Sequence, residues 1–331
     1  MGSRAAIVLA GLVLAGIGIG LALRARGGEP SPSTEAGERV NTPMPMPAFT
    51  LEFEIGRGSP DGLSFKGPFG VHVDDRGRLI VVDDLAHAAF VFADGGRLVE
   101  RFGIEGDAPG QFLYPDGVTT DASGNIYVAD AGANRVQVFD PAWKPIDAIR
   151  RAGLISRLAN PRDVAVGRDG RIFVADWGNH CVRVFDASRR HLQTIGGHGR
   201  SPGRFVNPVS VAISDDGSLY VSDHGNDRVQ VFDANGKLQR VIGSTGAAPG
   251  AFSGPSGLAV DDAGHLYVAD SGNHRVQLLA RGGAAPSAIG GGPNASLEQP
   301  VDVAVSARRL YVSDPGRHTV QVFRRTGPGF K

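Results

Sequence analysis

Residues 255–278, PSGLAVDDAGHLYVADSGNHRVQL, decide the fold of this chain of 331 residues. A proline precedes a first apolar run, and Asp-Asp-Ala-Gly separates that run from a second, which ends at Asp270. A Ser-Gly-Asn-His turn then leads into a third apolar run. Glycine adopts left-handed backbone angles without steric cost, and Asn and Asp tolerate them, so these stretches are typical of tight turns. The segment therefore predicts three short β-strands joined by turns.

The same pattern occurs six times from residue 49 onward. A proline opens each unit, at Pro68, Pro115, Pro161, Pro208, Pro255 and Pro300. An aspartate ends the second run of each unit, at Asp83, Asp130, Asp176, Asp223, Asp270 and Asp314. The aspartates are 44 to 47 residues apart. A period in the forties made of short strands indicates propeller blades, so the sequence predicts an all-β, six-bladed β-propeller over residues 49–325.

The fourth unit shows a complete blade. Its four strands are expected at residues 209–213, 219–222, 228–232 and 238–242. They lack a strict alternation of polar and apolar residues, as expected where both faces of a sheet are buried. Small residues lie mid-way along the first strand, as at Ala165, Ala212, Ala259 and Ala304, and this suits the crowded axis of a propeller. We also expect the blade aspartate to cap the amides of the turn that follows it.

The units resemble the NHL repeat. The pattern Pro-x-Gly-Leu-Ala-Val-Asp, then Leu-Tyr-Val-Ala-Asp-x-Gly-Asn-His-Arg-Val-Gln, is clearest over residues 255–278 and 208–232. The resemblance implies a six-bladed ring in which the last blade takes a strand from the start of the domain. The sixth unit has three strands, ending near Phe323, so residues 49–55 are expected to complete it, leaving a tail over 326–331. The first and sixth units depart from the pattern after Asp83 and Asp314.

An uncharged run of 19 residues, 5–23, follows a short flank of residues 1–4. A helix of that length spans roughly 28 Å, close to the thickness of a bilayer core. We therefore expect a transmembrane signal anchor, a Pro- and Gly-rich tether over residues 24–48, and a propeller outside the cytoplasm, in the periplasm or at the cell surface. The alternative is a cleaved signal peptide and a secreted protein.

The composition argues against nucleic acid as a partner. Lysines plus arginines number 34 and equal the acidic residues, so no global positive field exists. Some NHL propellers bind single-stranded RNA, and Arg135, Arg228 and Arg275 recur at one blade position. We expect these arginines to pair with turn carboxylates instead. Cys181 is the one cysteine of the sequence, so no intrachain disulfide can form.

Histidines raise the question of a metal. His87, His180, His274 and His318 all follow the blade aspartate by four residues, in different blades, and we expect a structural role in the turn. The amidating lyases, which are NHL-like, hold zinc with histidines near the axis. Here His72 is the axial candidate, since the matching positions are Thr119 and alanines. No cofactor is therefore predicted, and an axial Ca or Zn at His72 remains the alternative, in a metal-dependent lyase or hydrolase.

Residues that vary between repeats are the best recognition candidates, because the repeated ones build the frame. Those expected to share one loop face are Phe69, Asp116, Arg162, Asp163, Trp177, His180, His224 and Asp302. Trp177 suits an interface hot spot or a cover for its own blade. The sequence thus favours a non-catalytic scaffold or sensor that binds a protein or glycan through this face.

Overall fold

The structure is a computed structural model that describes residues 46–56, 62–153, 156–291 and 297–327. The expected anchor at 5–23 and most of the tether lie outside these residues. Within the described ranges, no helix is both long and apolar enough to cross a membrane.

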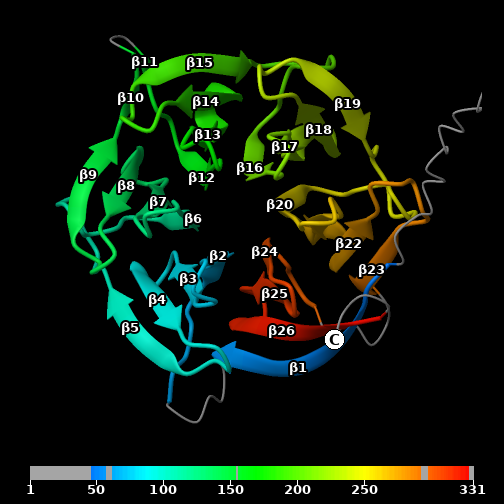
Figure 1. Ribbon diagram of the computed structural model, residues 1–331, viewed down its shortest axis with the longest axis horizontal. Coiled ribbons are helices and arrows are strands. Elements are labelled where there is room, and N and C mark those ends of the chain that lie inside the picture. Colours follow the sequence, from blue (N-terminus) through cyan, green and yellow to red (C-terminus); the bar gives the residue numbers. More distant parts are fainter. Residues whose placement is uncertain (1–45, 57–61, 154–155, 292–296, 328–331) are drawn as a thin grey trace, which may run out of the picture. The chain divides into compact units, whose positions relative to one another are not determined.

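Six four-stranded antiparallel sheets surround a central axis, and each is one blade of a propeller (Figure 1). Blade one consists of β2 (Pro68–Val73), β3 (Leu79–Asp83), β4 (Ala88–Phe92) and β5 (Leu98–Phe102). Blade two consists of β6 (Pro115–Thr120), β7 (Ile126–Asp130), β8 (Arg135–Phe139) and β9 (Pro145–Ile149). Blade three consists of β12 (Pro161–Val166), β13 (Ile172–Asp176), β14 (Cys181–Phe185) and β15 (His191–Gly196).

The remaining blades repeat this order from the axis outward. Blade four consists of β16 (Pro208–Ile213), β17 (Leu219–Asp223), β18 (Arg228–Phe232) and β19 (Leu238–Ile242). Blade five consists of β20 (Pro255–Val260), β21 (Leu266–Asp270), β22 (Arg275–Leu279) and β23 (Ser287–Gly290). Blade six consists of β24 (Asp302–Val305), β25 (Arg309–Asp314), β26 (Thr319–Thr326) and β1 (Ala48–Gly56). A small hairpin, β10 (Arg151–Ala152) and β11 (Ser156–Arg157), links blades two and three.

The ring closes through β1, the outermost strand of blade six. It pairs antiparallel with β26, from Ala48 opposite Thr326 to Gly56 opposite Thr319. β26 runs three residues beyond Phe323, because Ala48, Phe49 and Thr50 supply partners for that extension. This pairing joins segments about 270 residues apart in the sequence and covers the outer edge of β26. We call the junction of blades one and six the seam.

The core lies between neighbouring sheets. The second strands β3, β7, β13, β17 and β21 are buried along their whole length, as expected for strands covered on both faces. A buried apolar residue three positions before each blade proline also repeats, at Phe65, Phe112, Leu158, Phe205, Phe252 and Leu297. This position was not among the repeat markers expected from the sequence. It fills the space where the chain passes from one blade to the next.

The six blade aspartates are fully buried, and their role differs from the expectation. In η1 (Trp177–Asn179), η2 (His224–Asn226) and η3 (Ser271–Asn273), short 3-10 turns, the preceding aspartate makes no side-chain cap. The carboxylates instead accept N–H groups from the loop entering the first strand. Asp223 Oδ1, for example, accepts from Val206 N at 2.8 Å. In blade one, Asp83 also accepts from Ala86 N in its own turn.

Four of these aspartates form an ion pair with an arginine. Arg135, Arg228 and Arg275 donate through Nε to Asp130, Asp223 and Asp270 at 2.7–3.1 Å, which confirms the expected pairing. In blade three a cysteine holds the arginine position, and Arg183, two residues later, pairs with Asp176 at 2.9 Å. The arginine position is Ala88 in blade one and Thr319 in blade six. The seam blades therefore lack this buried pair.

The recurring histidines join neighbouring blades. His87, His180, His274 and His318 all adopt positive φ angles of 52–58°. His87 Nδ1 donates to Leu113 O at 2.7 Å, and His318 Nδ1 donates to Lys66 O at 2.8 Å across the seam. The structural role expected for these histidines is therefore observed.

Candidate functional site

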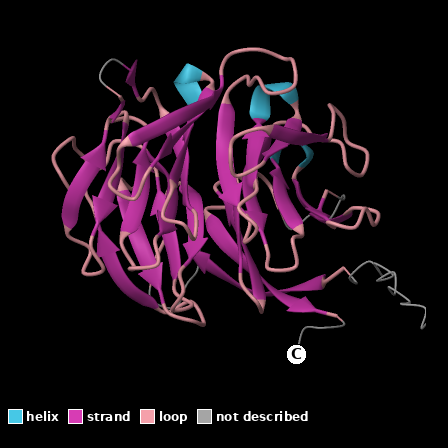
Figure 2. Cartoon of the chain, turned by 45° about the horizontal axis from the view of Figure 1, so that its top comes forward, coloured by secondary structure: helices cyan, strands magenta, loops and turns pink. Residues whose placement is uncertain are grey.

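The loops entering the first strands and the turns following the second strands lie at the same end of the ring. We call this end the upper face. The three 3-10 turns mark it along the top of Figure 2. The turns joining first to second strands and third to fourth strands form the lower face.

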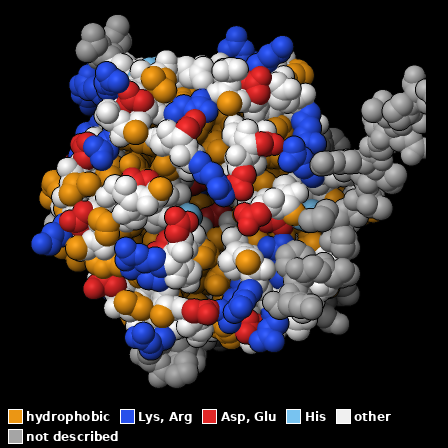
Figure 3. Space-filling view, viewed as in Figure 1, with side chains coloured by type: hydrophobic (Ala, Val, Ile, Leu, Met, Phe, Trp, Pro, Cys, Tyr) orange, Lys and Arg blue, Asp and Glu red, His pale blue; other side chains and the backbone are white. Residues whose placement is uncertain are grey.

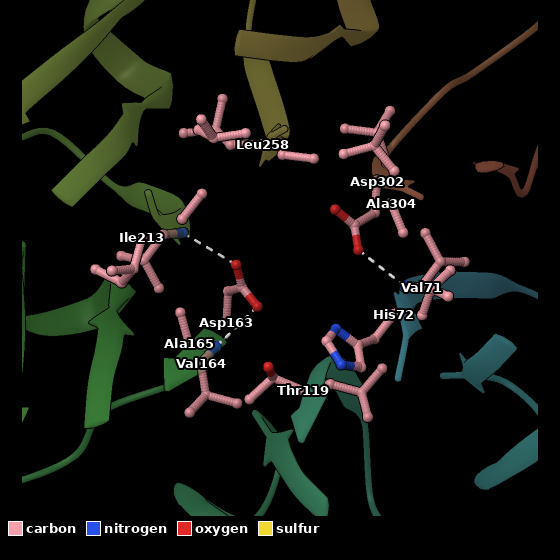
Figure 4. Close-up of a pocket in the computed structure, with 18 of the residues that line it drawn as sticks. Val71, His72, Thr119, Asp163, Val164, Ala165, Ile213, Leu258, Asp302 and Ala304 are labelled. Atoms are coloured by element: carbon pink, nitrogen blue, oxygen red, sulfur yellow. Dashed lines mark hydrogen bonds between the residues drawn. The ribbon is translucent and has the colours of Figure 1, made fainter. Parts of the chain in front are cut away.

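A cavity of about 230 Å³ lies on the axis and is lined by the first strands of all six blades. Most of its wall is Val, Leu, Ile and Ala, as the crowded axis led us to expect. Its polar groups are His72, Thr119, Asp163 and Asp302, whose side chains face the channel in Figure 4. The channel wall thus consists mostly of aliphatic residues and carries two carboxylates.

Asp163 and Asp302 each bridge to the next blade. Asp163 Oδ2 accepts from Ser210 Oγ at 2.8 Å and from Val211 N at 3.0 Å. Asp302 Oδ2 accepts from Val71 N at 2.8 Å across the seam. Burial raises the pKa of Asp163 to about 6, and it raises the pKa of Asp302 well above its usual value, with repulsion from Asp163 adding to the effect. These two predicted site residues therefore have a structural role as well as a partly buried position that faces the channel.

The glycines before these aspartates are required by close packing. A Cβ at Gly117 would lie 2.7 Å from the Cα of Asp163, and one at Gly257 would lie 2.5 Å from the Cα of Asp302. Both distances are shorter than real Cβ contacts, so each aspartate needs a glycine in the preceding blade. At this position the six blades carry Gly70, Gly117, Asp163, Ser210, Gly257 and Asp302, so each aspartate follows a blade that has a glycine.

Phe69, Asp116 and Arg162 come together on the upper face, although they belong to blades one, two and three. Arg162 Nη1 lies 2.8 Å from Asp116 Oδ2, and its guanidinium lies 5.0 Å from the centre of the Phe69 ring. Asp116 is buried, while 28% of the Arg162 side chain stays exposed. Burial raises the pKa of Asp116 to about 7 despite the opposing charge of Arg162. We call these three residues the mouth cluster.

Three further residues lie on the upper face, and of these only Leu85 and Tyr114 were not expected from the sequence. Asp84 has a pKa raised by burial and by Asp83, and Arg162 lowers it. Leu85 and Tyr114 leave 53% and 52% of their surface exposed. Each of the three adjoins a blade aspartate or proline in the sequence, and such adjacency was a usable signal. They add one carboxylate, which interacts with Arg162, and two apolar side chains to the upper face.

Trp177, His180 and His224 lie on the turns after the second strands of blades three and four. All three are partly exposed. His180 Nδ1 accepts from Asn207 N at 3.1 Å, and its ring lies 4.6 Å from that of His198. His224 Nδ1 donates to Pro255 O at 3.2 Å. Both histidines thus help to join blades, whereas Trp177 shows no aromatic or cation–π contact among the described residues.

His72 faces the channel at a position that is small in other blades. Its Nε2 lies 2.9 Å from Thr120 Oγ1, and burial lowers its pKa to about 4, so the ring is neutral near pH 7. Within the described residues, no group of three or more His, Cys, Asp or Glu side chains could hold a metal ion.

Comparison with known proteins assigns the repeat. A family model described as NHL repeat matches residues 112–139, 158–185, 205–232, 252–277 and 297–323. These stretches coincide with five of the six blades. The chain is an NHL-repeat propeller. The first unit of this NHL-repeat propeller, in which the sequence departs from the pattern, lies outside those five stretches.

One relative is NHL repeat-containing protein 3 of Mus musculus, 37% identical over 90 residues, or 24% of this chain and 23% of that protein. The matched region thus spans about a quarter of the relative. A virginiamycin B lyase from Staphylococcus aureus is a solved structure of similar fold, with a TM-score of 0.58, 15% identity and coverage of 86% of this chain and 90% of that one. A gluconolactonase from Xanthomonas campestris has a TM-score of 0.61, 18% identity and coverage of 79% and 87%. At these identities the two structures are similar to this chain in fold.

Proposed function

We propose that this chain is a non-catalytic binding module that holds a protein partner on its upper face, around the mouth cluster. The observation that carries the proposal is the meeting of Phe69, Asp116 and Arg162 from three consecutive blades, at positions that the repeat does not dictate. An arginine held on an aromatic ring and a buried carboxylate is pre-organised, so its exposed part binds a partner with little loss of side-chain entropy.

Exposed apolar and aromatic side chains on the upper face support the proposal of a protein partner. Leu85 and Tyr114 supply exposed apolar surface, and Trp177 adds a partly exposed aromatic ring. Arginine, tyrosine and tryptophan are the residues that most often dominate protein interfaces. A glycan, which would stack on the same aromatic rings, is the alternative occupant.

The described residues give less support to the other two functions. An axial lyase or hydrolase would need several metal ligands, but the strand positions equivalent to His72 carry a threonine and alanines. For RNA, the recurrent arginines would have to be free, yet Arg135 is fully buried in its pair with Asp130. Figure 3 shows basic and acidic side chains interspersed over the face that it presents, without a continuous basic surface.

We further propose that residues 5–23 anchor the chain in a membrane, that residues 24–48 act as a tether, and that the propeller lies outside the cytoplasm. The uncharged run of 19 residues supports this. Membrane fractionation with carbonate washing tests it, because an anchored protein stays in the pellet. A shortened, soluble mature form would instead indicate a cleaved signal peptide.

Affinity capture with the tagged full-length chain tests the binding face. We expect the double variant Arg162→Ala and Trp177→Ala to lose partners that the original chain retains. A matched control is Arg168→Ala with Leu192→Ala, which also removes an arginine and a large apolar side chain, from exposed positions 78% and 52% accessible. If the upper-face variant and the control retain the same partners, the proposed face is wrong.

A further inference from the structure

A second cavity, of about 560 Å³, lies at the lower face between blades six and one. Val73 lines both this cavity and the axial channel, so the two adjoin. Five arginines line it, namely Arg76, Arg308, Arg309, Arg324 and Arg325. We call this arginine-lined cavity the seam pocket. It is separate from the mouth cluster, which lies at the upper face.

One turn that lines the seam pocket differs from its five equivalents, because it holds no aspartate. In blades one, two and five an aspartate opens the turn between the first and second strands, and Asp121 Oδ1, for instance, accepts from Ser123 N and Asn125 N at 2.9 Å. In blades three and four, Asp169 and Asp216 within the turn accept its amides. In blade six, Ser306 Oγ accepts from Arg309 N at 3.1 Å and closes a turn that is one residue shorter. This turn therefore carries Arg308 and Arg309 without a negative charge.

The acidic residues of the pocket are already engaged. Glu52 in β1 accepts from Arg309 at 2.7 Å and from Arg324 at 2.8 Å, and these arginines lower its pKa to about 2. Asp94 also pairs with Arg309. Glu52 therefore stays ionised at physiological pH, bound to the two arginines.

Arg325 is engaged as well. It pairs with Asp261, a residue outside the pocket lining, at 2.6 Å, and donates to Ser306 O at 2.8 Å. By contrast, Arg76 and Arg308 are exposed, and neither guanidinium has a hydrogen bond or ion pair among the residues that the structure describes.

Two positive charges thus remain uncompensated. The lining holds five arginines against Glu52 and Asp94, and Asp261 neutralises one more positive charge. The cavity volume lies within the roughly 300–1,000 Å³ typical of small-molecule sites. We propose that the seam pocket binds a small organic dianion through its phosphate or carboxylate groups, with Arg76 and Arg308 as the residues that grip it.

The chemistry of guanidinium supports this assignment. Its planar donors match the oxygen geometry of both phosphate and carboxylate, and the resulting charge-assisted hydrogen bonds are about twice as strong as neutral ones. Arg309 and Arg324, held in place by Glu52, form a fixed wall against which a dianion can rest. Nucleotide-sized or sugar-phosphate-sized molecules fit such a site in charge and volume.

Isothermal titration calorimetry on the full-length, detergent-solubilised chain at low salt tests the proposal. The probes are inorganic phosphate and succinate, which distinguish phosphate from carboxylate as the recognised group. We expect at least one of them to bind, and to lose about tenfold or more in affinity in the variant Arg76→Ala/Arg308→Ala, since each arginine contributes charge-assisted hydrogen bonds. The control is Arg200→Ala/Arg240→Ala, which removes the same charge from exposed positions outside the pocket.

Both variants should melt at the temperature of the original chain, because none of the four guanidiniums has a partner among the described residues. If the pocket variant does not fold, Arg308→Gln alone takes its place. Absence of binding by both probes at millimolar concentration would overturn the proposal. Equal loss of affinity in the pocket variant and the control would also overturn it, because it would indicate only a general effect of charge.

Discussion

Blades two to five and the two seam blades differ in the groups that bond their buried blade aspartates. In blades two to five the buried aspartate is paired with an arginine that also bonds the entry loop, through carbonyls in blades two, four and five and through Ser156 Oγ in blade three. Arg135 donates to Asp107 O at 2.7 Å and to Gln111 O at 2.8 Å. In the seam blades, Asp83 and Asp314 accept only backbone N–H groups among the contacts described.

The difference shows which residues build the frame and which are free to vary. A paired arginine ties the entry loop of its blade to a fixed geometry. In the seam blades, stability comes from strand closure through β1, so the arginine position can become Ala88 or Thr319. Near the seam, Phe69 on the upper face and Arg308 on the lower face depart from the repeat, and we assign both to binding.

The largest expected effect comes from removing the Asp–Arg pair in one of the regular blades, which are blades two to five. Arg135→Ala should lower the free energy of unfolding by about 3–5 kcal/mol, since it leaves Asp130 buried without its counter-charge. Thr319→Ala, at the equivalent seam position, should cost about 1 kcal/mol, because it removes only a small polar group. Urea unfolding measures both. Equal losses would contradict the distinction between regular and seam blades.

The next effect tests closure of the ring. Ile55 in β1 and Ile195 in β15 occupy equivalent positions, opposite Val320 and Val182, and are 3% and 6% exposed. Each Ile→Ala change should cost about 2–4 kcal/mol through lost burial and a new cavity. A negligible loss for Ile55→Ala, with a normal loss for Ile195→Ala, would mean that β1 does not close the ring.

A pH titration tests the role of His72 at the axis. His72 replaces a small residue in blade one, and burial lowers its pKa to about 4. The unfolded chain binds a proton near pH 6.5, whereas the folded chain does so only near pH 4, so stability should fall as the pH drops through this range. His72→Gln should remove on the order of 1–3 kcal/mol of this dependence. Parallel stability profiles for the two proteins between pH 6.5 and 4 would exclude this role of His72.

The smallest effect concerns the mouth cluster. Arg162→Ala should change the free energy of unfolding by less than about 1 kcal/mol, because the arginine is partly exposed and the carboxyl of Asp116, with a pKa of about 7, takes up a proton readily once the positive charge is removed. The pKa of Asp116, about 7 with the arginine present, should rise further without its positive charge. An NMR titration of the Asp116 carboxyl measures this. An unchanged pKa would show that the ion pair does not form in solution.

Much of the fold was predictable because the repeat is local. The Pro and Asp markers and the Asp–Arg pairs follow from short, recurring patterns, whereas the closing segment 49–55 was expected from the resemblance to the NHL repeat and from the missing fourth strand of the sixth unit. The role of the blade aspartate was predicted correctly only for Asp83, which accepts a backbone N–H of its own turn. The other blade aspartates accept backbone N–H groups of the entry loop, such as Val206 N for Asp223, which lies 17 residues earlier in the sequence.

The candidate site was only partly accessible from the sequence. Variation between repeats did select the mouth cluster, yet it could not show that Asp163 and Asp302 bond the next blade, which depends on the spacing of strands around the axis. The seam pocket was missed for a similar reason. Glu52 and Arg324 are 272 residues apart, and only closure of the ring brings them together.

Site-specific photo-crosslinking in cells tests whether the upper face binds a protein partner. A photoreactive residue is placed at position 114 on the upper face or at position 192 on an outer strand, both of which are 52% exposed in the original chain. We expect a crosslinked protein partner from position 114 and none from position 192. Adducts from position 192 alone would contradict a partner-binding upper face.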